Sequence, residues 1–157
     1  MVGLGKLSAG FLGIGAMSLE VADFSELDVL LVEDNQFIRL LLREMLLAFG
    51  VRNVREVSDG TQALWQIQRR PPDLVITDWV MAPGDGLSLL RKLRSGARGG
   101  TPRIPVIVLS GHATDDYVAL ALGEGADSYI VKPFNAATLM THIMKVAKED
   151  KGVTYLA

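Results

Sequence analysis

The sequence predicts an α/β fold, with a doubly wound parallel sheet of five strands in the order 2-1-3-4-5 and five helices covering its two faces. Short apolar runs rich in β-branched residues alternate along the chain with segments whose apolar residues recur every three or four positions. This alternation is typical of a parallel sheet with helical crossovers. The expected strands comprise residues 29–32, 53–57, 74–78, 106–109 and 128–131.

Turn and capping residues separate these elements. Asn35 is the expected N-cap of a helix that ends at Gly50, and Thr114 is the expected N-cap of the fourth helix. In the first helix two series of apolar residues recur every four positions, and together they predict one broad apolar face. The series are Phe37, Leu41 and Met45, and Ile38, Leu42 and Leu46.

Composition limits the possible functions. The chain has 157 residues and a formal net charge of -2, which gives no general attraction to nucleic acid or to anionic membranes. It has no cysteine, which excludes disulfides, thiol catalysis and zinc–thiolate sites. No apolar stretch in the sequence is long enough to cross a bilayer, so we expect a cytoplasmic protein.

We expect a folded domain over residues 23–150 and a short tail over residues 151–157. Residues 1–22 are interrupted by glycines and are expected to form a flexible extension, with Met17 as an alternative start. A weak secretory signal that begins at Lys6 is the other interpretation of this segment.

Polar residues follow four of the predicted strands. The first strand leads into Glu33 and Asp34, the third ends on Asp78, the fourth leads into Ser110 and the fifth into Lys132. In the order 2-1-3-4-5 these four strands are neighbours, and ligands of open α/β sheets bind at the carboxyl ends of strands. Asp78 alone would be an ordinary turn residue, but the convergence of all five predicts one cleft.

The chemistry of this cleft points to a phosphoryl group. Three adjacent carboxylates repel one another unless a cation lies between them, and Mg²⁺ prefers such oxygen ligands. A cation, a lysine and a hydroxyl suit phosphoryl transfer, which depends on positioning and electrostatics. A carboxylate can itself be the nucleophile, and Asp78 is the central candidate.

The motifs at these strand ends resemble the receiver domains of bacterial two-component response regulators, which have a flavodoxin-like fold. The resemblance extends from about Asp28 to Ala147, and a proline that the family usually carries directly after Met81 comes one place later. The motifs are Val32-Glu33-Asp34-Asn35, Leu74-Val75-Ile76-Thr77-Asp78-Trp79-Val80-Met81, Asp85-Gly86, Val108-Leu109-Ser110-Gly111, Gly125-Ala126-Asp127 and Tyr129-Ile130-Val131-Lys132-Pro133-Phe134.

The resemblance implies that Asp78 is the phosphoacceptor. It also implies that Mg²⁺ is held by Glu33, Asp34, Asp78 and the backbone carbonyl of Val80. Mn²⁺ is expected to substitute for Mg²⁺.

The resemblance assigns further roles at the same site. Ser110 would bond a phosphoryl oxygen, Lys132 would pair with the phosphoryl group and precede a cis peptide bond, and Tyr129 would be a switch residue that turns inward with Ser110. Val80 and His112 would flank the water that hydrolyses the aspartyl-phosphate, and the apolar Val80 predicts slow hydrolysis.

The function implied is that of a single-domain response regulator in a histidine-to-aspartate phosphorelay. It would not be an enzyme beyond assisting its own phosphotransfer and dephosphorylation. A histidine kinase or a histidine phosphotransfer protein would be the donor, with neither nucleic acid nor membrane as a partner. The output would be protein contact through the fourth helix, fifth strand and fifth helix, near Tyr117, Tyr129, Lys145 and Lys148.

Three alternatives stay open at this stage. The chain could be a phosphate shuttle within a relay, or a flavodoxin-like protein that binds a small ligand. Against the flavodoxin alternative, Glu33 and Asp34 stand where a phosphate loop would be. A metal-dependent phosphatase with an aspartyl nucleophile would need an aspartate where Val80 stands.

Overall fold

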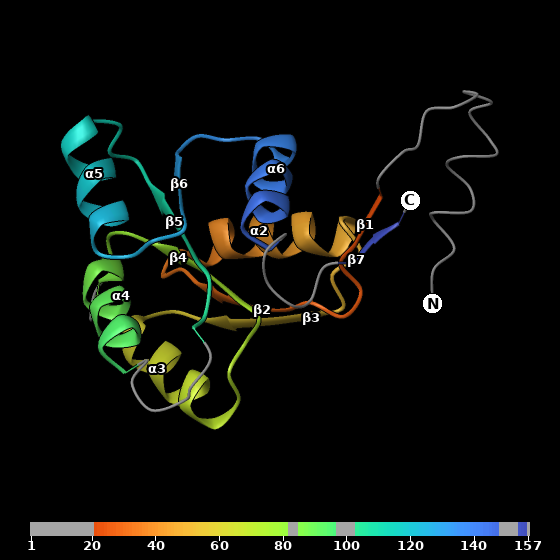
Figure 1. Ribbon diagram of the computed structural model, residues 1–157, viewed down its shortest axis with the longest axis horizontal. Coiled ribbons are helices and arrows are strands. Elements are labelled where there is room, and N and C mark those ends of the chain that lie inside the picture. The colour runs from red at the N-terminus through yellow and green to blue at the C-terminus, as the bar shows by residue number, and fades with distance from the viewer. Residues whose placement is uncertain (1–20, 82–84, 97–102, 148–153, 157) are drawn as a thin grey trace.

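The computed structural model describes residues 21–81, 85–96, 103–147 and 154–156 (Figure 1). Its main sheet is parallel and has five strands, in the order β3-β2-β4-β5-β6. Counted along the chain within this sheet, that order is the predicted 2-1-3-4-5. The strands are β2 (Asp28–Val32), β3 (Asn53–Val57), β4 (Leu74–Asp78), β5 (Val106–Ser110) and β6 (Ser128–Val131).

Helices cover both faces of this sheet because its central strands are apolar on both sides. Val29 and Leu31 belong to the core that packs against two of the helices, whereas Leu30 and Val32 belong to the core against the other three. The first pair is α2 (Gln36–Ala48) and α6 (Ala136–Ala147), and the other three are α3 (Gly60–Arg69), α4 (Gly86–Ser95) and α5 (Asp115–Gly123).

The start of α2 is capped as predicted. The Asn35 side chain accepts hydrogen bonds from the backbone N–H groups of Phe37 and Ile38, at 2.9 and 3.2 Å. After the helix, Gly50 has φ of 93°, a left-handed conformation that glycine adopts without strain. Thr114 occupies the predicted N-cap position of α5, but its side chain makes no capping hydrogen bond.

The broad apolar face predicted for α2 is only half buried. Leu42 and Leu46 pack into the core, but Phe37 is 74% exposed and Leu41 is 56% exposed. A helix lying on a sheet buries one stripe of side chains, and Phe37 and Leu41 fall outside that stripe, whereas Met45 of the same series packs against the core.

A second, antiparallel sheet of two strands was not predicted from the sequence. Strand β1 (Val21–Asp23) pairs with β7 (Thr154–Leu156), and in Figure 1 the pair lies apart from the main sheet, beside α2. Three-residue strands carry too little periodicity to be recognised. The interpretations of residues 1–20 lie outside the described residues, and none of the helices in the described part of the chain could cross a membrane.

Gly86 starts α4 directly against the turn that follows β4. Its N–H donates to the carbonyl of Trp79 at 2.9 Å, and an added Cβ would lie 2.4 Å from the backbone oxygen of Asp78. No Cβ fits at that distance, so the turn and the helix can approach this closely only because residue 86 is glycine.

We therefore expect Gly86→Ala to lower the free energy of unfolding by about 1–3 kcal/mol, since the helix or the turn must move. Urea unfolding of the two proteins measures this difference. Gly123→Ala is the matched control, because nothing lies within 4 Å of its added Cβ. Equal stabilities of the two variants would contradict the close approach at Gly86.

Candidate functional site

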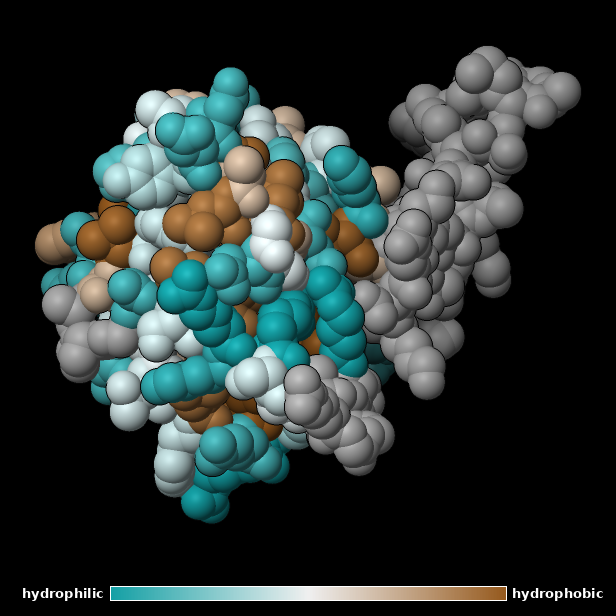
Figure 2. Space-filling model, turned by 60° about the vertical axis from the view of Figure 1, so that its left-hand side comes forward, coloured by the Kyte–Doolittle hydropathy of each residue, from teal (hydrophilic) through white to brown (hydrophobic). Residues whose placement is uncertain are grey.

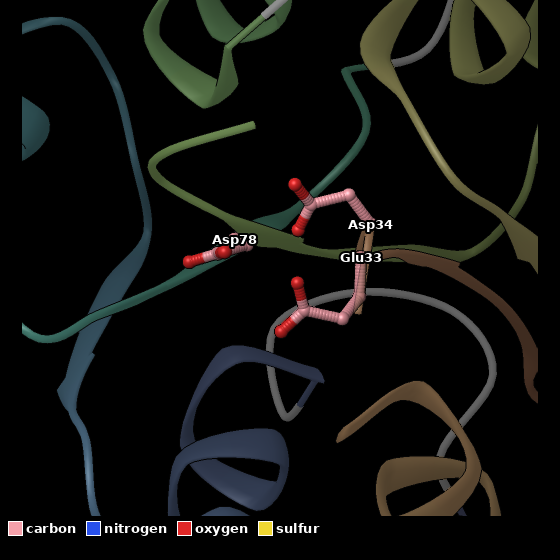
Figure 3. Close-up of side chains that lie close together, drawn as sticks. All are labelled: Glu33, Asp34 and Asp78. Atoms are coloured by element: carbon pink, nitrogen blue, oxygen red, sulfur yellow. The ribbon is translucent and has the colours of Figure 1, made fainter. Parts of the chain in front are cut away.

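Three carboxylates meet at the carboxyl ends of β2 and β4. Glu33 and Asp34 directly follow β2, Asp78 ends β4, and the two strands are hydrogen-bonded neighbours. One carboxylate oxygen from each side chain lies within 4.8 Å of the others. Figure 3 shows the three side chains gathered at this edge of the sheet. Glu33 is buried, Asp34 exposed and Asp78 half-buried, so the cluster opens to solvent on one side. The predicted convergence of these residues is confirmed.

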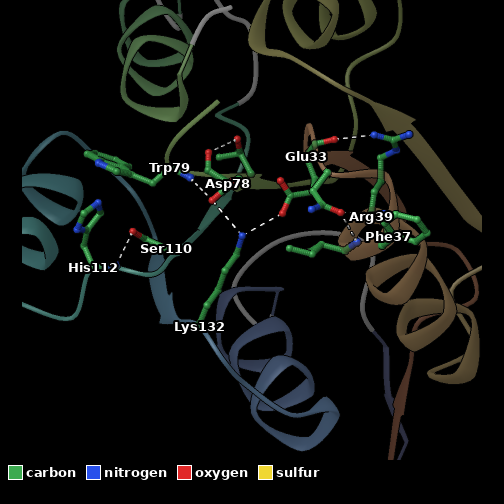
Figure 4. A network of polar contacts seen from close by, with 11 residues as sticks. Glu33, Phe37, Arg39, Asp78, Trp79, Ser110, His112 and Lys132 are labelled. Atoms are coloured by element: carbon green, nitrogen blue, oxygen red, sulfur yellow. Dashed lines mark hydrogen bonds and ion pairs between the residues drawn. The ribbon is translucent and has the colours of Figure 1, made fainter. Parts of the chain in front are cut away.

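Lys132 supplies the positive charge of the cluster. Its ammonium lies 3.0 Å from Glu33 Oε1 and 3.2 Å from Asp78 Oδ1 (Figure 4). The backbone N–H of Lys132 donates to the Ser110 carbonyl at 2.8 Å, and the peptide bond to Pro133 is cis as expected. Partial burial lowers the pKa of Lys132, but the hydrogen bond to Glu33 and the charge of Asp78 outweigh it and raise the pKa overall.

The surroundings of Glu33 disfavour the charged form of its carboxyl group. Burial raises its pKa from the ordinary 4.5 to about 7, the hydrogen bond from Lys132 opposes the rise, and the charge of Asp78 adds to it. Its second oxygen, Oε2, is buried and has no hydrogen-bond partner. Since the folded state holds this proton more tightly, the resulting stability is present at low pH and is lost as the pH rises through about 7.

The cluster therefore fits a divalent cation. Lys132 contacts only Glu33 and Asp78 of the three carboxylates, and one buried oxygen of Glu33 is unsatisfied. Hard cations bind such oxygen ligands and would remove the repulsion among them. Glu33, Asp34 and Asp78 are the side chains that would hold the cation, which would neutralise negative charge at Asp78.

Backbone and hydroxyl groups fix the edges of the site. Asp78 Oδ1 accepts the N–H of Trp79 at 2.9 Å, and the Trp79 ring is buried. Ser110 is buried at the end of the neighbouring strand β5, where its Oγ accepts the N–H of His112 at 3.1 Å. In Figure 4 this hydroxyl is directed toward His112 and not toward Asp78.

The other predicted site residues lie around this centre. Tyr129 is half-buried and donates its hydroxyl to the His112 carbonyl at 2.7 Å. The Val80 side chain, two residues after Asp78, is 60% exposed. The ring of His112 stacks on Tyr117, an arrangement that the sequence analysis did not foresee.

Arg39 is a further residue that the sequence analysis missed. From α2 it donates to the backbone carbonyl of Glu33 at 2.7 Å, and its guanidinium lies 3.4 Å from Glu56 on β3. It thereby holds the backbone of the acidic pair. On a sequence pattern it is an ordinary surface arginine, because only the position of α2 against the sheet brings it to Glu33.

Comparison with known proteins identifies the family. The model of the response regulator receiver domain matches residues 29–144. The chain belongs to the receiver-domain family of response regulators. This is the family that the strand-end motifs resemble, and the acidic cluster lies within the matched residues.

Named relatives support the same assignment. The chain is 32% identical over 124 residues to the chemotaxis protein CheY of Pseudomonas aeruginosa, covering 79% of this chain and 98% of that protein. It is 35% identical over 123 residues to the phosphate regulon transcriptional regulatory protein PhoB of Rhizobium meliloti, covering 78% of this chain but 53% of that protein. The chain thus spans about half the length of the PhoB relative.

Solved structures agree with the fold. The receiver domain of the Francisella response regulator 1452 superimposes with a TM-score of 0.71 at 27% identity, covering 79% of this chain and 99% of that one. A response regulator described as putative, from Chloroflexus aurantiacus, gives 0.70 at 25% identity, covering 78% and 98%. Receiver domains act in two-component signalling, where they interact with histidine kinases and with downstream targets.

We expect the binding of Mg²⁺ to change the fluorescence of Trp79, which adjoins the cluster. The substitution Asp34→Asn should weaken the affinity for Mg²⁺ roughly tenfold, or about 1.4 kcal/mol. The affinity should also fall as the pH drops below about 7, because a proton then competes for Glu33. A fluorescence titration at several pH values measures both effects.

Glu44→Gln is the control for this titration, since Glu44 is an exposed acid on α2 outside the cluster. Its titration should match that of the wild type. An Asp34→Asn curve that overlays the control would refute metal binding by the cluster.

Proposed function

We propose that Asp78 accepts a phosphoryl group from a phosphohistidine of a histidine kinase or a histidine phosphotransfer protein. The observation that carries this proposal is the position of Asp78 beside the acidic pair and in contact with the Lys132 ammonium. A carboxylate oxygen of Asp78 forms a bond to phosphorus as the bond from phosphorus to the histidine nitrogen breaks. The electron pair of that bond stays on the imidazole, which takes up a proton.

The neighbouring residues assist this transfer. Lys132 and Trp79 N–H already contact Asp78 Oδ1, so the acceptor is oriented before a donor arrives. Lys132 and the Ser110 hydroxyl then bond the phosphoryl oxygens. Mg²⁺ is the cation proposed for Glu33, Asp34, Asp78 and the Val80 carbonyl, with Mn²⁺ as a substitute. The protein is thus a phosphoacceptor that assists its own chemistry, and not an enzyme acting on a separate substrate.

The output surface proposed is the face formed by α5, β6 and α6, the elements predicted as the fourth helix, fifth strand and fifth helix. Apolar side chains of α5 are exposed on it: Tyr117 by 38%, Leu120 by 40% and Leu122 by 47%. Figure 2 brings forward the side of Figure 1 where α5 lies and shows brown apolar patches among polar side chains. Among the expected cations Lys145 is exposed, and Lys148 lies outside the described residues.

The rival interpretations lack support at the site. A flavodoxin-like loop would offer backbone and hydroxyl donors to a phosphate after the first strand, but β2 leads into Glu33 and Asp34. An aspartyl phosphatase would need a general acid two residues after Asp78, where Val80 has none. The phosphate-shuttle role uses the same site and differs only in the partner that receives the phosphoryl group.

Incubation with acetyl phosphate and Mg²⁺ should add one phosphoryl group, and Asp78→Asn should abolish the addition. The reason is that Asp78 alone combines a strand-end position with contacts from Lys132 and Trp79. Intact-mass measurement detects the product, and circular dichroism verifies that the variant is folded. Asp85→Asn, outside the cluster, is the control. Stoichiometric labelling of folded Asp78→Asn would refute the assignment.

The aspartyl-phosphate should hydrolyse slowly, because Val80 beside the acceptor offers no hydrogen bond to orient a water. We expect Val80→Asn to accelerate the decay roughly tenfold, within the range that positioning supplies. The measurement is the loss of phosphorylated protein after acetyl phosphate is removed, with and without the added change His112→Glu. Leu40→Asn, an exposed site on α2, is the control. Decay of the wild type at the rate of Val80→Asn would exclude this role of Val80.

A further inference from the structure

His112 joins three elements through three different contacts. Its backbone N–H donates to Ser110 Oγ at 3.1 Å, and its carbonyl accepts the Tyr129 hydroxyl at 2.7 Å. Its ring stacks on Tyr117 with 4.3 Å between centroids and 16° between planes. One residue in the loop after β5 is therefore bonded to the site, to β6 and to α5.

The ring contact takes the place of a missing cap. Thr114 at the start of α5 has no side-chain capping bond, so the first turn of this helix is not fixed by the usual means. Tyr117 lies in that first turn, and its stack on His112 ties the turn to the loop. An aromatic pair of this kind stabilises an arrangement beyond simple burial.

The contact with Ser110 competes with phosphoryl binding. The Ser110 hydroxyl is directed toward His112 in Figure 4, and reaching a phosphoryl group on Asp78 requires it to turn. The turn removes the acceptor of the His112 N–H. The loop arrangement is then less stable than before, which favours movement of the loop. Any contact that holds His112 in place opposes this movement.

We propose that His112 is a positioning residue whose stack on Tyr117 holds the loop in its unphosphorylated arrangement and couples the site to α5. The proposal rests on the proposed function of Asp78 and adds the route by which its phosphorylation reaches α5. His112 acts here through its ring on Tyr117, and not by contact with the reacting atoms.

This role predicts the effect of removing the stack. Without it the loop should move more readily, so a phosphoryl mimic should bind about three- to tenfold more tightly, the range that one aromatic pair supports. Tyr117→Leu removes the ring but keeps an apolar side chain, and Tyr117→Phe keeps the ring. His112→Ala and His112→Phe form the second matched pair.

The experiment titrates beryllofluoride, in the presence of Mg²⁺, into the full chain and follows Trp79 fluorescence. We expect higher affinity for Tyr117→Leu and His112→Ala and wild-type affinity for the two phenylalanine variants. The double variant Tyr117→Leu/His112→Ala should gain no more than either single change, because both remove one contact.

A second measurement tests the coupling itself. Fluorotyrosine labelling gives signals from Tyr117, Tyr129 and Tyr155, and Tyr155 on β7 serves as the internal reference. In the wild type beryllofluoride should shift the Tyr117 and Tyr129 signals together. In His112→Ala the Tyr129 signal should still shift, whereas the shift of Tyr117 should be lost.

The outcomes separate this inference from the proposed function. If the wild type binds beryllofluoride but the leucine and phenylalanine variants of Tyr117 behave alike, the coupling role is overturned and the phosphoacceptor role stands. Additive gains in the double variant, or an unchanged Tyr117 shift in His112→Ala, would overturn it too. If the wild type neither binds the mimic nor accepts a phosphoryl group, both proposals fail.

Discussion

The shortage of positive charge at the carboxyl ends of the strands is the constraint on which this site depends. The ammonium of Lys132 contacts two of the three clustered carboxylates, Glu33 and Asp78, and Glu33 keeps a buried oxygen without a partner. Two carboxylates at the opposite ends of the strands are different, because each of them contacts two arginines. Asp28 contacts Arg55 and Arg70, and Asp127 contacts Arg94 and Arg103.

The carboxylates that contact two arginines therefore differ from the cluster of Glu33, Asp34 and Asp78. A paired carboxylate at a strand end stabilises a local arrangement and gains little from an added ligand. A cluster with too few cationic partners costs stability that a bound cation would return, which makes the binding of that cation favourable. The raised pKa of Glu33 expresses the same imbalance, since burial and the charge of Asp78 outweigh the help of Lys132.

The rest of the fold positions this cluster and connects it to the surface. The parallel sheet places β2, β4, β5 and β6 side by side, so the residues that follow these strands must meet. The close approach of Gly86 holds the start of α4 against the turn after Asp78. The loop after β5 links the same edge to α5, which exposes the apolar side chains of Tyr117, Leu120 and Leu122.

The sequence by itself determined the sheet and the membership of the site. Strands such as Leu74–Asp78 are continuous apolar runs that end at turn residues. This pattern can be recognised in the sequence without knowledge of the tertiary structure. Glu33, Asp34 and Asp78 follow from the strand order alone, because parallel strands end at one edge.

Only the tertiary structure decided which residues from different segments contact one another. The exposure of Phe37 depends on which stripe of α2 faces the sheet, and the pairing of β1 with β7 joins segments far apart in the chain. The contact of Arg39 with the Glu33 carbonyl and the stack of His112 on Tyr117 likewise depend on how helices are placed against loops. Local periodicity and capping residues report on a segment and its burial, whereas contacts between segments depend on packing that no single segment encodes.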